Sequence, residues 1–139
     1  MKPPLENIRV SARSREILIN LKRKTGIANW NVICRWAFCD SLSNPNRPVA
    51  AIGSAESNVE MSWETFAGEF AEVLLAVFNK RAAQDGLSQE KHDRATYFRS
   101  HLERGISQLQ NAKNLSDLFV KATTKTTPSK NGVGSQIAI

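Results

Sequence analysis

The chain of 139 residues lacks most of the features that mark membrane, secreted or metal-binding proteins. No apolar run reaches the roughly eighteen residues that a membrane-spanning helix needs. The first ten residues, MKPPLENIRV, lack the apolar core of a signal peptide, which predicts a cytoplasmic protein. The two cysteines, Cys34 and Cys39, form no Cys-x-x-Cys pair and have no further cysteine to complete a metal or cluster site. We therefore expect two buried free thiols and no cofactor.

Catalytic motifs are also missing. The sequence contains no Gly-x-Ser-x-Gly, no His-Glu-x-x-His and no glycine-rich phosphate loop. Its histidines are His92 and His101, and the helical neighbours of His101 three and four positions away include no carboxylate that could orient the ring as a base. We expect His101 to make a structural hydrogen bond or a partner contact, and the chain not to be an enzyme.

What the sequence does have is a localised positive charge. The first 35 residues hold eight basic and two acidic side chains, and this excess accounts for the whole net charge of +6. The remaining residues carry equal numbers of basic and acidic groups. A positive field confined to one segment of a balanced chain indicates a polyanionic partner, of which nucleic acid is the commonest.

Hydrophobic periodicity predicts a mainly α-helical, compact domain over residues 1–122, followed by a disordered tail over residues 123–139. Residues 43–61 are expected to form a long connection, in which Val49–Ile52 could be a short strand. The predicted elements are a strand at residues 6–11 and helices at about 14–25, 30–43, 63–84, 89–111 and 115–122.

Residues 6–42 have the strand–helix–helix order of a ribbon-helix-helix unit, in which two paired strands enter the major groove of DNA. Asn7, Arg9 and Ser11 would lie on the outward face of the strand, where they suit base edges or phosphates. A generic helical hairpin with a basic surface explains the same pattern equally well, because the strand is so short.

The run Lys22-Arg23-Lys24 lies at the end of the first predicted helix. Basic residues there also stabilise the helix dipole, but three in succession exceed what that role needs. Contact with backbone phosphates explains the run better, since lysines bind phosphate without reading sequence. The other candidates for DNA contact come from the same basic segment: Arg9, Arg13, Arg15, Asn31 and Arg35.

Two further segments indicate protein contacts. The predicted helix at 63–84 is apolar almost all round, so it is either central in the domain or packed against another subunit. Residues 40–72 contain six acids and a single arginine. Such a segment is usually a solvated face, and a partner surface is the alternative.

Four stretches of the sequence resemble the DNA sulfur-modification protein DndE family. They lie within roughly residues 3–110, and the third contains the most distinctive residue order. The stretches are PPLENIRVS at 3–11, LKRKTGI at 21–27, NWNVICRWAFC at 29–39 and FRSHLERGI at 98–106.

The resemblance implies a non-catalytic subunit of the machinery that replaces a non-bridging phosphate oxygen of DNA with sulfur. In that family, sulfur mobilisation, the iron–sulfur cluster and the ATPase belong to companion proteins. It further implies a homotetramer that prefers nicked duplex DNA and binds it through a lysine-bearing surface, which Lys22, Arg23 and Lys24 match here. Two other hypotheses stay open. One is a ribbon-helix-helix repressor that reads a palindrome through Asn7 and Arg9, and the other is a scaffold that binds companion proteins through residues 40–72.

Overall fold

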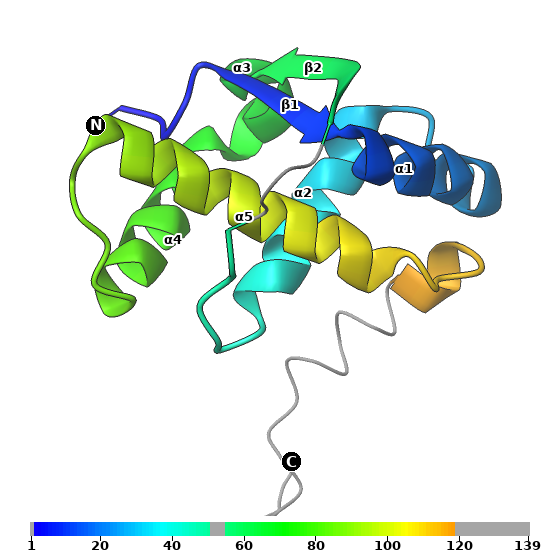
Figure 1. The fold of residues 1–139 in the computed structure, drawn as a ribbon. Helices are drawn as coiled ribbons and strands as arrows, with labels where there is room; N and C mark the ends of the chain where they lie inside the picture. The colour runs from blue at the N-terminus through cyan, green and yellow to red at the C-terminus, as the bar shows by residue number, and fades with distance from the viewer. Residues whose placement is uncertain (1, 51–54, 119–139) are drawn as a thin grey trace, which may run out of the picture.

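The computed structural model describes residues 2–50 and 55–118, and the predicted disordered tail at 123–139 lies outside them. The described part is mainly helical, with one small two-stranded sheet (Figure 1). In chain order the elements are β1 (Asn7–Ser11), α1 (Ala12–Thr25), α2 (Trp30–Leu42), β2 (Glu56–Ser62), α3 (Trp63–Ala67), the 3-10 turn η1 (Gly68–Phe70), α4 (Ala71–Gln84) and α5 (Lys91–Leu109). A mainly α-helical domain with an N-terminal strand, as predicted, is therefore confirmed.

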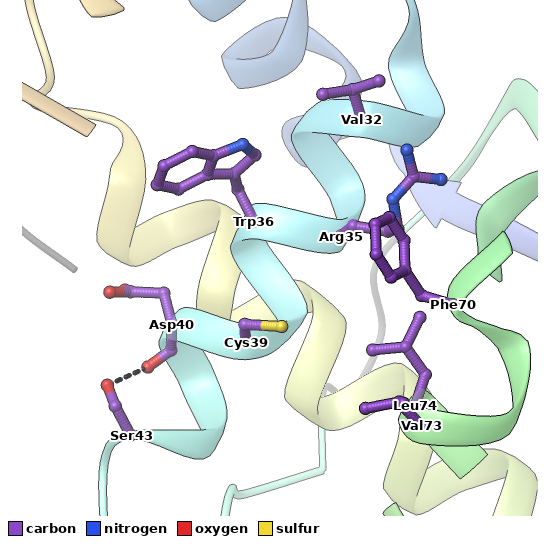
Figure 2. A pocket seen from close by; sticks show the side chains of 9 residues that line it. All are labelled: Val32, Arg35, Trp36, Cys39, Asp40, Ser43, Phe70, Val73 and Leu74. Atoms are coloured by element: carbon purple, nitrogen blue, oxygen red, sulfur yellow. Dashed lines mark hydrogen bonds between the residues drawn. The ribbon is translucent and has the colours of Figure 1, made fainter. Parts of the chain in front are cut away.

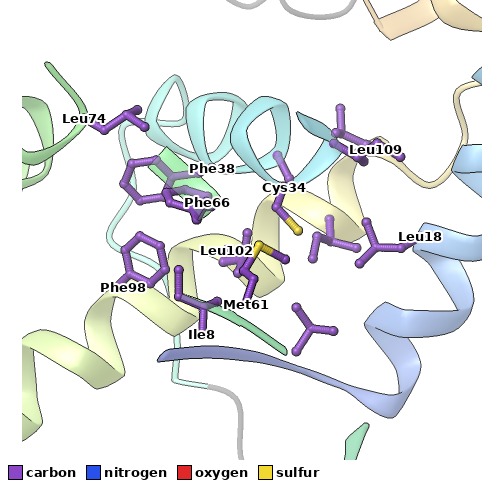
Figure 3. Close-up of a cluster of buried hydrophobic side chains, with 14 of the residues drawn as sticks. Ile8, Leu18, Cys34, Phe38, Met61, Phe66, Leu74, Phe98, Leu102 and Leu109 are labelled. Carbon is purple, nitrogen blue, oxygen red and sulfur yellow. The ribbon is translucent and has the colours of Figure 1, made fainter. Parts of the chain in front are cut away.

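The core lies where α2 crosses α5, and both helices contribute large buried side chains (Figure 3). The ring centroids of Phe38 and Phe98 are 5.0 Å apart, and the ring of Phe66 meets that of Phe98 edge-on at 5.3 Å. Ile8 and Leu18 close the same core from β1 and α1. The strand and both N-terminal helices are thus tied to α5 by apolar contacts, which fixes the position of the basic segment.

The sheet pairs β1 with β2 of the same chain in antiparallel register, with Asn7 opposite Ser62. The prediction of a long connection over 43–61 is therefore wrong for its second half. Val59 and Met61 are buried and alternate with exposed residues, which is the period of a half-buried strand. Neither Val49 nor Ala50 is in a strand, and residues 51 and 52 of the predicted strand Val49–Ile52 lie outside the described residues.

Ser11 is the N-cap of α1, because its Oγ accepts a hydrogen bond from the backbone N–H of Ser14. The helix therefore begins at residue 12 rather than 14. The prediction that Ser11 faces outward is wrong: the residue is buried, and Glu103 of α5 accepts hydrogen bonds from its N–H and Oγ. The predicted end of this helix is confirmed, since Gly26 has the left-handed φ of 77° that terminates helices.

The single helix predicted at 63–84 is wrong, because the chain breaks at Gly68. There φ is 56° and ψ is −137°, a conformation that favours glycine and interrupts the helix. Ser62 caps the short α3 through the N–H of Thr65, and α4 continues in a new direction to a C-cap at Asp85. The break lets α3 and α4 both contact the α2–α5 pair.

Polar contacts fasten the loop after α2 to α4 and α5. Arg81 of α4 is buried and donates hydrogen bonds to the carbonyls of Leu42 (2.8 Å), Asn44 (2.7 Å) and Asn46 (2.8 Å). The loop after α2 is thus held in place by hydrogen bonds to its backbone carbonyls, so it needs no secondary structure of its own.

Residues 115–118 are helical, at the start of the last predicted helix.

Candidate nucleic-acid interface

The last turn of α1 carries Lys22, Arg23 and Lys24, which we call the α1 basic turn. Arg23 is exposed and donates to the side chain of Asn20 at 3.1 Å, whereas Lys22 and Lys24 are half-buried. The Lys22 Nζ lies 4.1 Å from the centroid of the Trp30 ring, a cation–π contact that directs it toward the start of α2. None of the three pairs with a carboxylate of the described residues, so their charges remain uncompensated.

The first turns of α1 add two further cations. Arg13 is exposed, and Arg15 pairs with its neighbour Glu16 at 3.3 Å on the surface. An exposed ion pair of this kind contributes little free energy, so Arg15 can exchange Glu16 for another partner at little cost in stability. Both arginines therefore remain available to an anion, together with the α1 basic turn.

Arg9, by contrast, is already occupied. It lies opposite Glu60 across the sheet, donates to that carboxylate at 2.9 Å and donates to the carbonyl of Ser57 at 2.8 Å. The arginine that the repressor hypothesis assigns to base reading is therefore bonded to the neighbouring strand instead. This arrangement weakens the ribbon-helix-helix repressor hypothesis, which needs Arg9 to face DNA.

Asn31 and Arg35 lie on α2 and make contacts within the protein. Asn31 donates to the carbonyl of Thr65 at 3.1 Å, and Arg35 donates to that of Phe66 at 2.7 Å while its guanidinium lies 5.7 Å from the Phe70 ring centroid. Both residues hold α3 and η1 against α2. The structure thus gathers five of the eight predicted contacts on α1 and uses the other three in protein packing.

An apolar groove between α2 and α4 was not predicted (Figure 2). It has a volume of about 540 Å³, and Phe70, Val73 and Leu74 line it opposite α2. Phe70 and Val73 are 47% and 63% exposed, although large apolar side chains are usually buried. The groove is lined by Val32, Arg35, Trp36, Cys39, Asp40, Ser43, Phe70, Val73 and Leu74.

The burial and the pKa of each cysteine decide whether its thiol could act as a nucleophile. Cys34 is buried, as predicted, and burial raises its pKa to about 12, so the thiol stays protonated. The prediction of burial is wrong for Cys39, which is exposed at the groove, although partial desolvation there still raises its pKa.

The predicted structural hydrogen bond of His101 is confirmed, since Nδ1 lies 2.8 Å from the Ser41 Oγ. Burial, together with the charges of Arg104 and Arg81, lowers the pKa of His101 to about 3, so the ring is neutral at neutral pH. Arg104 Nε also donates to the Ser41 Oγ at 2.8 Å, so the serine hydroxyl joins the ring to the guanidinium.

Within residues 2–50 and 55–118, no three His, Cys, Asp or Glu side chains come together as a metal site. Over the same residues, none of the helices combines the length and the apolar character needed to cross a bilayer.

A family model described as DNA sulphur modification protein DndE matches residues 7–117. The chain belongs to the DndE family. The matched residues run from the first residue of β1 to beyond the end of α5, so they include the α1 basic turn and the groove. Membership of the DndE family, expected from the four resembling stretches, is thereby confirmed, and it places the chain in DNA phosphorothioation.

Solved DndE structures share the fold. The crystal structure of DndE from Escherichia coli B7A, involved in DNA phosphorothioation modification, has a TM-score of 0.60 and 23% sequence identity, covering 78% of this chain and 99% of that chain. The crystal structure of a DndE mutant involved in DNA phosphorothioation has a TM-score of 0.59 and 22% identity, covering 77% and 98%. No curated protein matches the chain.

Proposed function

We propose that this DndE-family chain is a non-catalytic subunit of the DNA phosphorothioation machinery that holds duplex DNA by its backbone phosphates. The observation that carries the proposal is the α1 basic turn, where three adjacent cations have no carboxylate partner among the described residues. Arg13 and Arg15 extend the same surface along the helix. Contacts of this kind position a protein on DNA without reading its sequence.

We further propose a preference for nicked duplex. A nick makes the duplex locally flexible and frees the strand ends, so the DNA adapts to a helix surface that does not enter a groove. The engagement of Arg9 with both Glu60 and the Ser57 carbonyl supports phosphate contact over base reading, because Arg9 would have to give up two contacts before it could reach a base.

The state of the titratable groups supports a role without catalysis. His101 is buried and neutral, and the Cys34 thiol is buried with a raised pKa. The exposed Cys39 also has a raised pKa, which makes it a poor nucleophile at neutral pH. Sulfur insertion would then belong to companion proteins, which this subunit brings to DNA.

The test is a gel-shift titration with nicked, intact and single-stranded DNA of one sequence over a series of salt concentrations. Replacing Lys22, Arg23 and Lys24 together by Ala should weaken binding alike on all sequences. The slope of log affinity against log salt should fall by about one unit for each lost contact. The matched control replaces Lys80, Arg99 and Lys113, which are two lysines and one arginine that are also exposed, and should leave the slope nearly unchanged.

An unchanged slope in the α1 variant would remove the α1 basic turn from the interface. Equal affinity for nicked and intact duplex at every salt concentration would end the nick preference. A discrete protected operator in footprinting would restore the repressor hypothesis.

We also propose that the chain assembles as a homotetramer through the apolar groove. Phe70, Val73 and Val77 are exposed along one side of η1 and α4, next to the exposed part of α2. Burial against a second copy would remove this apolar surface from water. Companion proteins of the modification system would then meet the assembly on its remaining surfaces.

A further inference from the structure

A second cleft lies at the N-terminal end of α5 and is lined in part by residues 2–6. The N-terminal segment runs close to the start of that helix (Figure 1). We call this second cleft the N-terminal cleft. It has a volume of about 750 Å³, within the range of sites that bind small ligands. The start of α5 and the N-terminal segment lie at the opposite end of the domain from α1 (Figure 1), and none of the residues that line the cleft belongs to α1.

The charges that line the N-terminal cleft are mainly positive. Lys2 and Lys91 are exposed and carry their ammonium groups on flexible stems, while Arg94 is half-buried in the wall. Glu6 is the acidic residue that lines the cleft, so cations outnumber it three to one. This excess selects an anionic ligand over a neutral or cationic one.

Arg94 is fixed in place before any ligand arrives. Its guanidinium donates to the side-chain oxygen of Asn79 at 2.9 Å and to the carbonyl of Lys2 at 3.2 Å, and it lies 5.1 Å from the centroid of the Phe78 ring. An arginine has five N–H donors, and these two hydrogen bonds leave donors for a ligand. A preoriented guanidinium suits phosphate oxygens, because it meets them with a planar pair of donors.

The rest of the lining is not charged. The chain at residues 3–5 is Pro-Pro-Leu, in which Pro4 and Leu5 are buried and give the cleft an apolar wall. Gln89 adds an amide with both donor and acceptor groups. Cations, an amide and an apolar wall in one cavity match the three parts of a nucleotide, namely its phosphate, the polar edge of its base and its flat ring.

We propose that the N-terminal cleft binds a nucleotide unit of DNA, with the phosphate held by Lys2, Lys91 and Arg94. The phosphate could be a strand-end monoester or a backbone phosphodiester, since both present the same oxygens. This second site is independent of the α1 basic turn and goes beyond the proposed grip on duplex DNA. Together the two sites would let one subunit hold duplex DNA at α1 and a single nucleotide at the opposite end of the domain.

The test is a titration of the full chain with inorganic phosphate at constant ionic strength, followed by ¹H–¹⁵N NMR. Saturable shifts are expected for the amides of Asn79, Gln89, Lys91 and Arg94. Reversing the exposed Lys91 in Lys91→Glu should weaken phosphate affinity by at least about tenfold. The matched control, Lys113→Glu, reverses an exposed lysine outside the cleft and should keep the wild-type affinity.

Short single-stranded oligonucleotides with a 5′-phosphate or a 5′-hydroxyl then identify the source of the phosphate. Shifts with the phosphorylated strand alone assign the cleft to strand ends, and equal shifts with both assign it to the backbone. Shifts that do not saturate, that are equal in Lys91→Glu and wild type, or that appear with phosphate but with neither oligonucleotide would overturn the proposal. Because the α1 triple variant should keep these shifts, failure here and failure of the duplex-binding proposal are distinguishable.

Discussion

Gly105 of α5 lies directly against the backbone of Ala37 in α2. A Cβ atom on residue 105 would be 1.8 Å from the Ala37 carbonyl oxygen, far closer than any real contact. The two helices that make the centre of the core therefore approach each other through a position that admits no side chain at all.

Replacing Gly105 by Ala should lower the free energy of unfolding by about 3 kcal/mol, because the helices must move apart to admit the methyl group. Helix propensity alone predicts the opposite sign, a gain of about 1 kcal/mol. Urea unfolding followed by circular dichroism measures the difference, with Arg99→Ala on the exposed face of α5 as the control. A more stable Gly105→Ala protein would show that the close approach is not needed.

The carboxylate of Glu103 joins α5 to the start of α1. It accepts hydrogen bonds from the Ser11 N–H at 2.9 Å, from the Ser11 Oγ at 2.8 Å and from the Ser14 Oγ. Glu103→Ala should cost about 2–4 kcal/mol of stability, because it leaves these donors without their charged acceptor. Glu103→Gln, which keeps the shape and one acceptor oxygen, should lose less. Equal losses in the two variants, measured by urea unfolding, would mean that packing rather than the carboxylate holds the junction.

His101 should make stability depend on pH. Its folded pKa of about 3 lies below the ordinary value of 6.5, so between these values the unfolded chain binds a proton that the folded chain does not. Stability is therefore fully present above pH 6.5 and falls as the pH drops, by up to about 1.4 kcal/mol per pH unit from this residue.

The measurement is the free energy of unfolding between pH 4.5 and 6.5, compared with His101→Gln, whose amide can keep a hydrogen bond with Ser41 but does not titrate. This range stays above the acid region in which Asp85 titrates. Burial alone would raise the pKa of Asp85, but the Tyr97 hydrogen bond and the Arg81 charge lower it overall. The variant should show a flatter pH dependence, and identical slopes would remove His101 as the source.

The exposed side of the apolar groove should control oligomeric state. Val73→Glu places a charge among side chains that a second copy would bury, so light scattering should report a smaller assembly than for the wild type. Val49→Glu makes the same change at a valine that is 87% exposed and outside the groove, and it should leave the assembly intact. If both variants kept the wild-type mass, the groove would not be the interface.

The sequence predicted those elements that are determined by residues close together in the chain. The end of α1 before Gly26 and the start of α3 at residue 63, which Ser62 caps, follow from backbone hydrogen bonding that neighbouring residues complete themselves. The buried stripe of α5, with Phe98 and Leu102, follows from its helical period. The positive charge of α1 was also predicted, because the net charge of a segment can be counted from its sequence alone.

The features that were missed depend on contacts between distant residues. Glu60 gives no sign in sequence that it will face Arg9, and that pairing decides whether the arginine is free. Gly68 interrupts an apolar pattern that continues from Phe66 to Phe70, so periodicity alone extends the helix through it. The signal that could have found β2 was the alternation at Val59 and Met61, which was too short to outweigh the polar residues around it.

The pairing of β1 with β2 also constrains how the chain is made. Arg9 and Glu60 are 51 residues apart, so β1 leaves the ribosome before its partner strand does. Until then Ile8 and Val10 have no sheet to cover them, and the strand edge is open to any other chain nearby. Synthesis that stops before residue 56 would release a segment that contains all of α1 but lacks β2, and the unpaired β1 would make that segment prone to aggregation.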